Sequence, residues 1–372
     1  MQHPGNLPTS WASYFVDEIE FGANYSLLDK IQRLPRVVYS SQARSRLAEL
    51  LLAARPDVCH AHNIYHHISP SILGLLKEKN VPTVLTLHDL KIACPAYTML
   101  THDGICERCR GGRLHNVLIH RCIKNSVALS ALIYLESLVH TFLRSYRDNV
   151  SLFVVPSRFY ISKFVEWGMP ANLFRHIPNF VAADRFRPEY QAGKAILYFG
   201  RVSREKGLDT LIRAAAIAKS SIAIVGTGPQ LAALEKLAAE VGANVRFHGY
   251  LSGSELHDAV RSARAVVLPS EWYENAPMSV LEAYALGKPL IGANIGGIPE
   301  LIRPGSTGLL FPSGNVDSLA EILRQVGDFT DSKIAEMGQS ARQLVETQYA
   351  PAAYAVSVLS AYRELGVASA LQ

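Results

Sequence analysis

The carboxyl half of the chain alternates short apolar runs with segments of helical period, and this alternation restricts the fold more than any other feature. The apolar runs are bounded by glycine or proline and cover 194–200, 221–226, 244–249, 264–269, 287–293 and 307–311. Segments of helical period, such as 207–219 and 229–240, separate most of them. This pattern predicts an α/β fold, a doubly wound parallel sheet with helices on both faces. Because ligands of such sheets bind beyond the carboxyl ends of the strands, the loops there should carry the chemistry.

The composition indicates two domains and excludes several classes of protein. With 372 residues, 49% of them hydrophobic and 19% charged, the chain can bury a core in each half. The net charge of +5 is too small for a nucleic-acid partner, although it suits phosphorylated small molecules or an anionic membrane face. The longest apolar stretch, 126–143, is interrupted by Glu136 and His140, and no charged and apolar leader opens the chain. We therefore expect a soluble, cytoplasmic protein.

The loop after the first of these strands reads GRVSREKG and holds two cations. Gly200 permits a close turn, Arg201 and Lys206 lie in the loop, and a helix is predicted to open at 207–209. Free amides and fixed positive charges then converge on one point, which is typical of a diphosphate site. Two solvated surface cations are the alternative interpretation of this loop alone.

The loop after the second strand reads VGTGPQL. Gly226 and Gly228 allow a ligand to approach the backbone, but Leu231 stands where a dinucleotide fingerprint has its third glycine. No acidic residue closes the next strand at 244–249, so the pattern argues against an NAD site. The alternative is a simple connection from strand to helix.

The loop after the fourth strand, EWYENAPMSVLE, places two carboxylates on either side of a helix start. Pro277 suits the first turn of a helix over 277–286, which leaves the amides of residues 276, 278 and 279 free for phosphate oxygens. Glu274 precedes this helix and Glu282 lies in its second turn, so both carboxylates can accept hydrogen bonds from the hydroxyls of one bound molecule. In the alternative, Glu274 caps the helix and Glu282 meets a neighbouring arginine. The next loop, NIGGIPELI, should line the same crevice.

Several motifs, in this order, resemble the retaining glycosyltransferases of family 4, which have the GT-B fold. In the carboxyl half they are GRVSREKGLDTLIRAA, VGTGP, the pair Glu274 and Glu282, GKPLIGANIGGIPELI and TGLLFPSGNVDSLAEIL. In the amino half they are RPDVCHAHNIYHHISPSIL, VLTLHDLKIACPAY, VVPSRFYISKF and HIPNFVAADRFRP. The resemblance covers nearly the whole chain and implies two Rossmann-like doubly wound domains that face a cleft.

The resemblance also implies a role for individual residues. Arg201 and Lys206 would hold the donor diphosphate, Glu282 the ribose, and Glu274 the donor sugar, while His88 would face that sugar from the amino domain. Without the resemblance, His88 would be read as a core or loop histidine. The catalytic candidates are thus His88 and Glu274, and the donor-binding candidates are Gly200, Arg201, Lys206, Gly226, Gly228, Asn275, Ala276, Pro277, Met278, Ser279 and Glu282. Catalysis would need no divalent metal, because the cations and the helix dipole neutralise the leaving group.

The expected domains follow from the same resemblance. Residues 1–178 would form the acceptor-side domain with an insert at 94–122, residues 179–345 the nucleotide-sugar domain, and residues 346–372 a crossover helix that returns to the first domain. Closure of the two domains over the donor would be the working motion.

The amino terminus departs from the family pattern. The chain opens on MQHPGNLPTSWASYFVDEIEFG, which looks like the segment that normally follows the second strand. We expect an incomplete amino domain, lacking about forty residues with the first strand and its glycine-rich loop, and therefore an exposed strand edge. A mis-chosen start codon, a truncated pseudoenzyme and a form whose active site is completed otherwise are the three explanations.

Four of the five cysteines follow the pattern Cys-x11-Cys-x2-Cys-x12-Cys, at Cys94, Cys106, Cys109 and Cys122. A structural zinc ion is the favoured interpretation, with free thiols, a disulfide pair or an iron–sulfur site as alternatives. Cys59 is expected in the core. Strand alternation gives His60 and His62 one shared face, but without a nearby carboxylate, which argues against a metal there.

The insert is also basic and is followed by an apolar run. Its cations are Arg108, Arg110, Arg113, Arg121 and Lys124, and the run reads ALSALIYLESLVHTFLRSYR. Cations beside an apolar helix can rest on anionic lipid or hold a polyprenyl-diphosphate acceptor. An ordinary core helix with a solvated basic end is the alternative.

The sequence therefore predicts a retaining, metal-independent glycosyltransferase of cell-surface or exopolysaccharide assembly. Its donor would be UDP- or GDP-linked, its acceptor a glycan or a polyprenyl-diphosphate-linked glycan, and its place the cytoplasm or the inner face of the membrane. A catalytically inactive remnant that binds nucleotide-sugar or a partner is the runner-up. A nucleotide-sugar epimerase is less favoured, because epimerases of this fold lack the glutamate pair in this setting.

Overall fold

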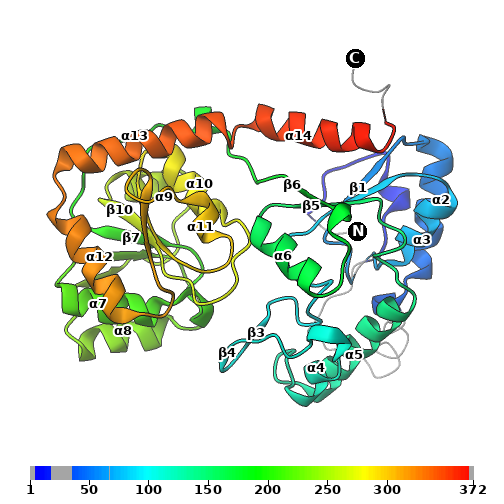
Figure 1. Ribbon diagram of the computed structural model, residues 1–372, viewed down its shortest axis with the longest axis horizontal. Coiled ribbons are helices and arrows are strands. Elements are labelled where there is room, and N and C mark those ends of the chain that lie inside the picture. Colours follow the sequence, from blue (N-terminus) through cyan, green and yellow to red (C-terminus); the bar gives the residue numbers. More distant parts are fainter. Residues whose placement is uncertain (1–4, 18–35, 67, 368–372) are drawn as a thin grey trace.

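The computed structural model describes residues 5–17, 36–66 and 68–367, which form two α/β lobes side by side (Figure 1). The amino-terminal lobe holds a parallel sheet of order β1-β2-β5-β6. Its strands are β1 (Cys59–His62), β2 (Thr83–Thr86), β5 (Leu152–Val155) and β6 (Phe174–His176). Strands β2 and β5 are buried along their whole length, as expected of parallel strands covered on both faces.

The carboxyl-terminal lobe holds a six-stranded parallel sheet of order β12-β11-β10-β7-β8-β9. Its strands are β7 (Ile196–Phe199), β8 (Ile222–Val225), β9 (Val245–Phe247), β10 (Ala265–Leu268), β11 (Leu290–Ala293) and β12 (Gly308–Phe311). All six lie within the predicted apolar runs, so the predicted doubly wound sheet is confirmed. Strand β7 lies between β8 and β10, where the strand order reverses, and ligands of such sheets bind at this switch point.

Helices cover both sheets. In the carboxyl-terminal lobe they are α7 (Leu208–Ala218), α8 (Leu231–Glu240), α9 (Gly253–Arg261), α10 (Met278–Ala285), α11 (Ile298–Leu301), α12 (Val316–Asp328) and α13 (Asp331–Thr347). In the amino-terminal lobe they are α2 (Ser41–Ala54), α3 (Ser71–Glu78), α4 (Asn116–Ile119), α5 (Val127–Phe142) and α6 (Arg158–Glu166). Helix α10 begins one residue later than predicted, because Pro277 has an extended ψ of 123° and is its N-cap.

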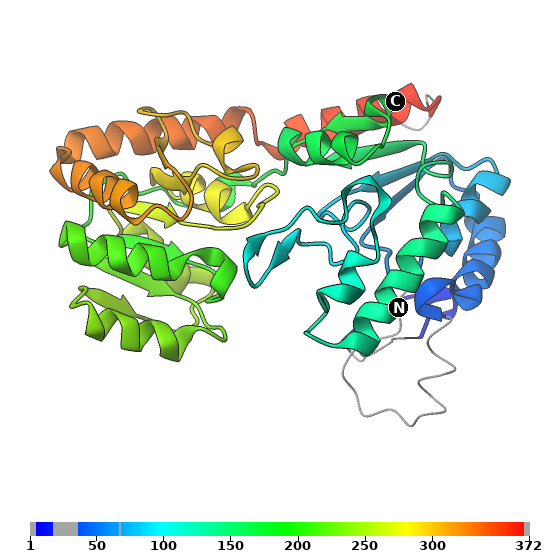
Figure 2. The same ribbon diagram turned by 60° about the horizontal axis from the view of Figure 1, so that its bottom comes forward.

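The insert between β2 and α5 contains little regular structure. It holds the two-residue strands β3 (Leu100–Thr101) and β4 (Gly104–Ile105), a 3₁₀ turn at Arg110–Gly112, and the single turn of α4. The hairpin of β3 and β4 extends from the amino-terminal lobe toward the carboxyl-terminal lobe (Figures 1 and 2).

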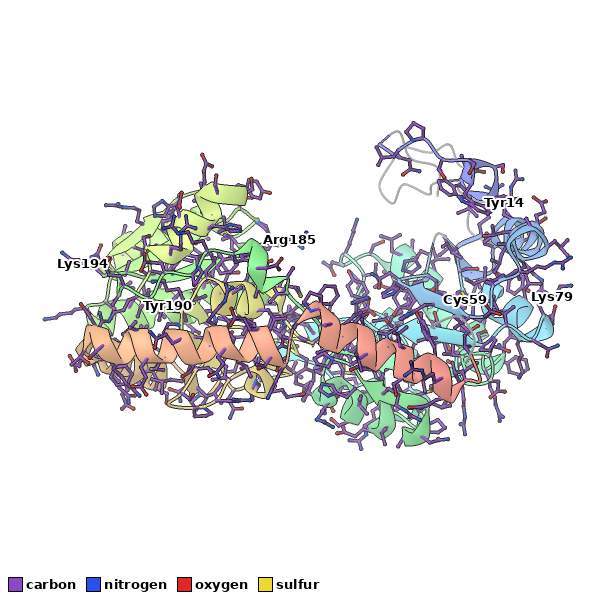
Figure 3. The ribbon with its side chains drawn as sticks, turned by 90° about the horizontal axis from the view of Figure 1, so that it is seen from above. Tyr14, Cys59, Lys79, Arg185, Tyr190 and Lys194 are labelled. Atoms are coloured by element: carbon purple, nitrogen blue, oxygen red, sulfur yellow. The ribbon has the colours of Figure 1, made fainter. Side chains whose placement is uncertain are left out.

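The chain returns to the amino-terminal lobe through α14 (Pro351–Glu364), which continues the line of α13 along both lobes (Figures 1 and 3). Val358 and Ala361 of α14 pack in one cluster with Val84, Leu152 and Val154 of the amino-terminal sheet. Across this contact Tyr362 hydrogen-bonds His60, at 2.7 Å between the hydroxyl oxygen and Nδ1. The chain first passes between the lobes in the segment from β6 to β7, and α14 joins them a second time. Within the described residues, no helix combines the length and apolar character needed to cross a bilayer.

We predict that acid weakens this packing. Burial, with smaller contributions from the neighbouring His62 and His88, lowers the pKa of His60 to about 4. Since this pKa lies below the unfolded value of about 6.5, the folded state binds fewer protons, so stability is complete above pH 6.5 and falls toward pH 4. After a discount for partial exposure, the expected loss in unfolding free energy is about 1 to 2 kcal/mol.

Urea unfolding at pH 7.5 and at pH 4.5 measures this loss. The His60→Gln variant, which keeps hydrogen-bonding capacity without titrating, should show a smaller loss than the parent chain. Equal losses in the two chains would contradict the assignment to His60.

Candidate active site

The loops that follow β7, β8 and β9 meet beside the switch point of the carboxyl-terminal sheet. A pocket of about 540 Å³ opens there, within the size range of ligand sites. Its lining includes three short loop segments and one side chain of α10, namely Gly200, Arg201, Gly226, Thr227, Tyr250, Leu251, Ser252 and Glu282. The structure thus brings four predicted donor-binding residues, Gly200, Arg201, Gly226 and Glu282, to one pocket.

Glu282 supplies the carboxylate of this pocket from the second turn of α10. Partial burial raises the pKa of this carboxyl group above the ordinary value for a glutamate. A carboxylate in such a place gains from ligand groups that donate hydrogen bonds, such as the paired hydroxyls of a sugar.

Gly226 and Gly228 allow the loops after β7 and β8 to touch through their backbones. A Cβ on Gly226 would lie 1.8 Å from the carbonyl oxygen of Gly200, and one on Gly228 would lie 2.1 Å from that of Val202. The amide of Val202 also donates to the carbonyl of Thr227 at 2.9 Å. Gly226 lines the pocket. Gly228 does not line it, but its close contact with the backbone of Val202 holds the two loops together.

Lys206 and Glu274 form an ion pair, with 2.7 Å between Nζ and Oε1. The hydroxyl of Ser270 donates to the same carboxylate oxygen at 2.7 Å, and the ammonium group lies 5.1 Å from the ring centroid of Trp272. Glu274 is buried and does not line the pocket that contains Glu282. The prediction that the two carboxylates flank one molecule therefore requires a ligand that extends from the Glu282 pocket to the Lys206–Glu274 pair.

The loop after β11 supports Glu274 through a second pair of close glycines. A Cβ on Gly296 would lie 2.5 Å from the carbonyl oxygen of Glu274, and one on Gly297 would lie 1.8 Å from that of Asn275. The amide of Gly297 donates to the carbonyl of Glu274 at 2.8 Å. The predicted NIGG turn thus contacts the loop after β10 directly.

The loop after β10 is also bonded to the amino-terminal lobe. The side-chain amide of Asn275 donates to the carbonyls of Leu87 at 3.1 Å and His88 at 3.3 Å, and it accepts from the hydroxyl of Ser157 at 2.8 Å. The side chain of Asn179 donates to the carbonyl of Ala276 at 3.0 Å. Asn275, a predicted donor ligand, therefore contacts the other lobe. Because Asn275 directly follows Glu274 in the chain, its bond brings the backbone of His88 near that residue.

His88 belongs to a stack of imidazoles at the carboxyl ends of β1 and β2. Its Nε2 lies 2.9 Å from Nδ1 of His62, and the rings of His60 and His62 stack with centroids 4.7 Å apart. Desolvation lowers the pKa of His88 and of His62, so both rings are neutral at neutral pH. The sequence indicated the shared face of His60 and His62 but missed their contact with His88.

Glu300 is a further residue that the sequence analysis missed. Its carboxylate accepts from the amides of Arg158 at 2.8 Å and Phe159 at 2.7 Å, so a residue of α11 caps the first turn of α6 in the other lobe. A glutamate at a helix start was visible in the sequence, but its partner lies 142 positions away.

The remaining predicted residues lie close to these groups. Pro277, Met278 and Ser279 form the start of α10, and the first-turn amides of this helix have no helical carbonyl to bond. The four cysteines of the insert line a different, smaller cavity. Across the described ranges, no three His, Cys, Asp or Glu side chains stand in an arrangement that could hold a metal ion.

Two family models match the chain. The model described as Glycosyl transferases group 1 matches residues 182–344, and the model described as Glycosyltransferase Family 4 matches residues 28–185. A curated relative, the GDP-mannose-dependent alpha-(1-6)-phosphatidylinositol monomannoside mannosyltransferase of Mycobacterium tuberculosis, is 30% identical over 232 residues. That match covers 56% of this chain and 60% of the relative, so the matched region spans about three fifths of the relative's length.

Solved structures share the fold. Sucrose-phosphate synthase from Thermosynechococcus elongatus aligns with a TM-score of 0.66 at 21% identity, covering 88% of this chain and 78% of that one. Anabaena HepE in complex with UDP aligns with a TM-score of 0.63 at 18% identity, covering 87% and 82%. These similarities show the GT-B architecture that the sequence predicted.

We predict that Gly228→Ala disrupts the pocket. The added methyl group would meet backbone rather than a movable side chain, so the loops after β7 and β8 must separate; we expect a loss of about 2 to 3 kcal/mol in unfolding free energy. Gly327→Ala in α12 is the matched control, because nothing lies within 4 Å of its added Cβ. That helical change should be neutral or stabilise by up to about 1 kcal/mol. Thermal and urea unfolding compare the two variants. Equal stabilities would show that the close approach of Gly228 to the backbone of Val202 is unimportant.

Proposed function

The chain belongs to the retaining glycosyltransferases of family 4, and on that premise we propose that it transfers a sugar from a nucleotide-sugar to a glycan or lipid-linked acceptor with retention of configuration. One observation carries the proposal most directly. Arg201, Glu282 and the backbone of two glycine turns share a single pocket at the switch point of the carboxyl-terminal sheet.

The donor's diphosphate would be bound by Arg201, Lys206 and the first-turn amides of α10. The guanidinium and ammonium groups supply fixed charge, while the amides at the start of a helix supply oriented dipoles. Glu282 would accept hydrogen bonds from the ribose hydroxyls, because its partly buried carboxylate favours hydrogen-bond donors. UDP and GDP both satisfy this arrangement, so the base is left to experiment.

The donor sugar would lie toward Glu274 and His88. Glu274, which is paired with Lys206, would accept from sugar hydroxyls, with the amides of Ala276, Met278 and Ser279 beside it. His88 would act as a neutral hydrogen-bonding group, since desolvation lowers its pKa. The leaving diphosphate would then take the proton of the incoming acceptor hydroxyl, on the same face of the sugar from which it departs.

We propose that transfer needs no divalent metal, because Arg201, Lys206 and the dipole of α10 already oppose the charge that develops on the leaving diphosphate. A zinc ion bound by Cys94, Cys106, Cys109 and Cys122 would be structural and would take no part in transfer.

The proposed domains are residues 1–178 on the acceptor side, 179–345 on the donor side, and 346–372 as the crossover. Contacts of α14 with the amino-terminal sheet and bonds of Asn275 with the carbonyls of Leu87 and His88 support this division. Rotation of the lobes about these contacts would open the site for donor exchange.

A lipid-linked acceptor would be reached at the inner face of the membrane. Leu135, Leu138 and Phe142 lie three and four positions apart on α5 and are 51%, 44% and 85% exposed. Exposed cations lie near both ends of this helix, at Arg121, Lys124, Arg144 and Arg147. An apolar face between cations suits anionic lipid headgroups.

We predict micromolar binding of one nucleotide, UDP or GDP, and of its sugar conjugate to this chain, measured by titration calorimetry. Arg201→Ala and Glu282→Ala should each weaken binding by about tenfold or more, since each removes a charged hydrogen-bonding group. Glu274→Gln should spare nucleotide binding and lower the rate of sugar transfer. Lys236→Ala is the control, because that lysine is exposed on α8 and should change neither property.

Three outcomes would overturn the proposal. Unchanged nucleotide binding and transfer in all of these variants would sink the site assignment. Nucleotide binding without transfer to any acceptor would identify the inactive form, and release of an isomerised sugar nucleotide would identify an epimerase.

We also predict co-sedimentation with vesicles that contain phosphatidylglycerol, and little with phosphatidylcholine alone. The Leu138→Ser, Phe142→Ser double variant should lose most of this binding, whereas Val356→Ser on α14, 66% exposed in the parent, should keep it. Equal sedimentation with both kinds of vesicle would rule the contact out.

A further inference from the structure

Four cysteines from three turns of the insert line one small cavity. Cys94 follows β2, Cys106 and Cys109 follow the hairpin of β3 and β4, and Cys122 follows α4. The cavity has a volume of about 10 Å³, which is room for one atom-sized occupant. All four residues are free thiols in the structure. Convergence of four separated cysteines on an atom-sized space is the pattern of a closed metal site.

The insert has few other means of holding its fold. Its regular structure is limited to the short elements already described, and the completely buried apolar side chains within 94–122 are Met99 and Val117. Segments with so little core usually need a metal or covalent cross-link to order their backbone. The hairpin of the insert nevertheless extends toward the other lobe (Figure 2).

We infer that one zinc ion is bound by Cys94, Cys106, Cys109 and Cys122. We also infer that this site, through Glu107, positions the donor loop, which is the segment between β10 and α10 that carries Glu274. On binding, each thiol releases its proton to solvent and its sulfur becomes a zinc ligand. In the structure the four sulfurs are not arranged as a formed metal site. The inference therefore requires the four thiols to move toward one another when zinc binds. Four thiolates on Zn²⁺ carry a net charge of −2, which the basic insert offsets, beginning with Arg108 beside Cys122.

Glu107 connects this site to the donor loop. It lies inside the Cys106-x2-Cys109 turn, and its carboxylate accepts from the hydroxyl of Tyr273 at 2.9 Å, with Lys163 also 2.9 Å away. Tyr273 directly precedes Glu274, and its carbonyl accepts from the hydroxyl of Tyr160 at 2.9 Å. A turn held by zinc would therefore fix one end of the segment that carries Glu274. This second part rests on the proposed donor site, whereas zinc binding does not.

The zinc site is tested first by metal content. Mass spectrometry of the purified chain should find about one zinc ion per molecule, and X-ray absorption should find four sulfur neighbours. Cobalt in place of zinc should give the visible absorption of a tetrahedral thiolate site. Cys106→Ser and Cys109→Ser should lose the metal, while Cys59→Ser should keep it. A metal-free chain with four titratable thiols, a chain with disulfides, or a chain with bound iron would each overturn the inference.

The link to the donor site is tested with variants that keep the metal. Glu107→Ala and Tyr273→Phe remove the same hydrogen bond from either side, so each should raise the donor KM by roughly three- to tenfold and the double variant by no more. Zinc content and nucleoside diphosphate affinity should be unchanged, a combination that general destabilisation would not produce. Unchanged KM in both single variants would refute the link. A zinc-loaded parent chain that binds no nucleotide would instead refute the proposed function and leave the zinc site intact.

Discussion

The segment between β10 and α10 is the constraint on which the site depends, because its residues bond to both lobes. Glu274 pairs with Lys206 in its own lobe, while Asn275 and Tyr273 bond to the amino-terminal lobe. Gly296 and Gly297 lie against the backbone of this segment without room for side chains. Since neighbours on several sides fix the same few residues, the two halves of the site are positioned together rather than independently.

Charge in this region is compensated wherever it is buried. The carboxylate of Glu274 has an ammonium and a hydroxyl partner, and that of Glu300 accepts from two amides of α6. The imidazoles at the ends of β1 and β2 avoid the cost of burying a charge in another way, because their lowered pKa values keep the rings neutral. A diphosphate brought to Arg201 and Lys206 would meet cations whose geometry is already set by the loops and by the Lys206–Glu274 pair.

Local sequence predicted much of the fold and part of the site. Apolar runs located all six strands of the carboxyl-terminal sheet, and the glycine turns located the loops that form the pocket. Arg201 was predicted as a cation in the loop after a strand, and Glu282 from its place in the second turn of the helix that follows another strand; both line that pocket. The sequence analysis missed the bonds of Glu300 with α6 and of Glu107 with Tyr273, since the partners are more than 140 positions apart and no local pattern encodes such a separation.

By itself the sequence determined the strand and helix periods, the positions of turns that need glycine, and the set of cysteines, because these follow from the local geometry of the chain. Tertiary structure alone decided which charges meet. It paired Lys206 with Glu274, directed Asn275 to the other lobe, and stacked His62 on His88. Such contacts arise when elements that are distant in the chain pack together, within one lobe or between the two. Packing depends on the shape and charge of whole surfaces rather than on the residues beside each position in the chain.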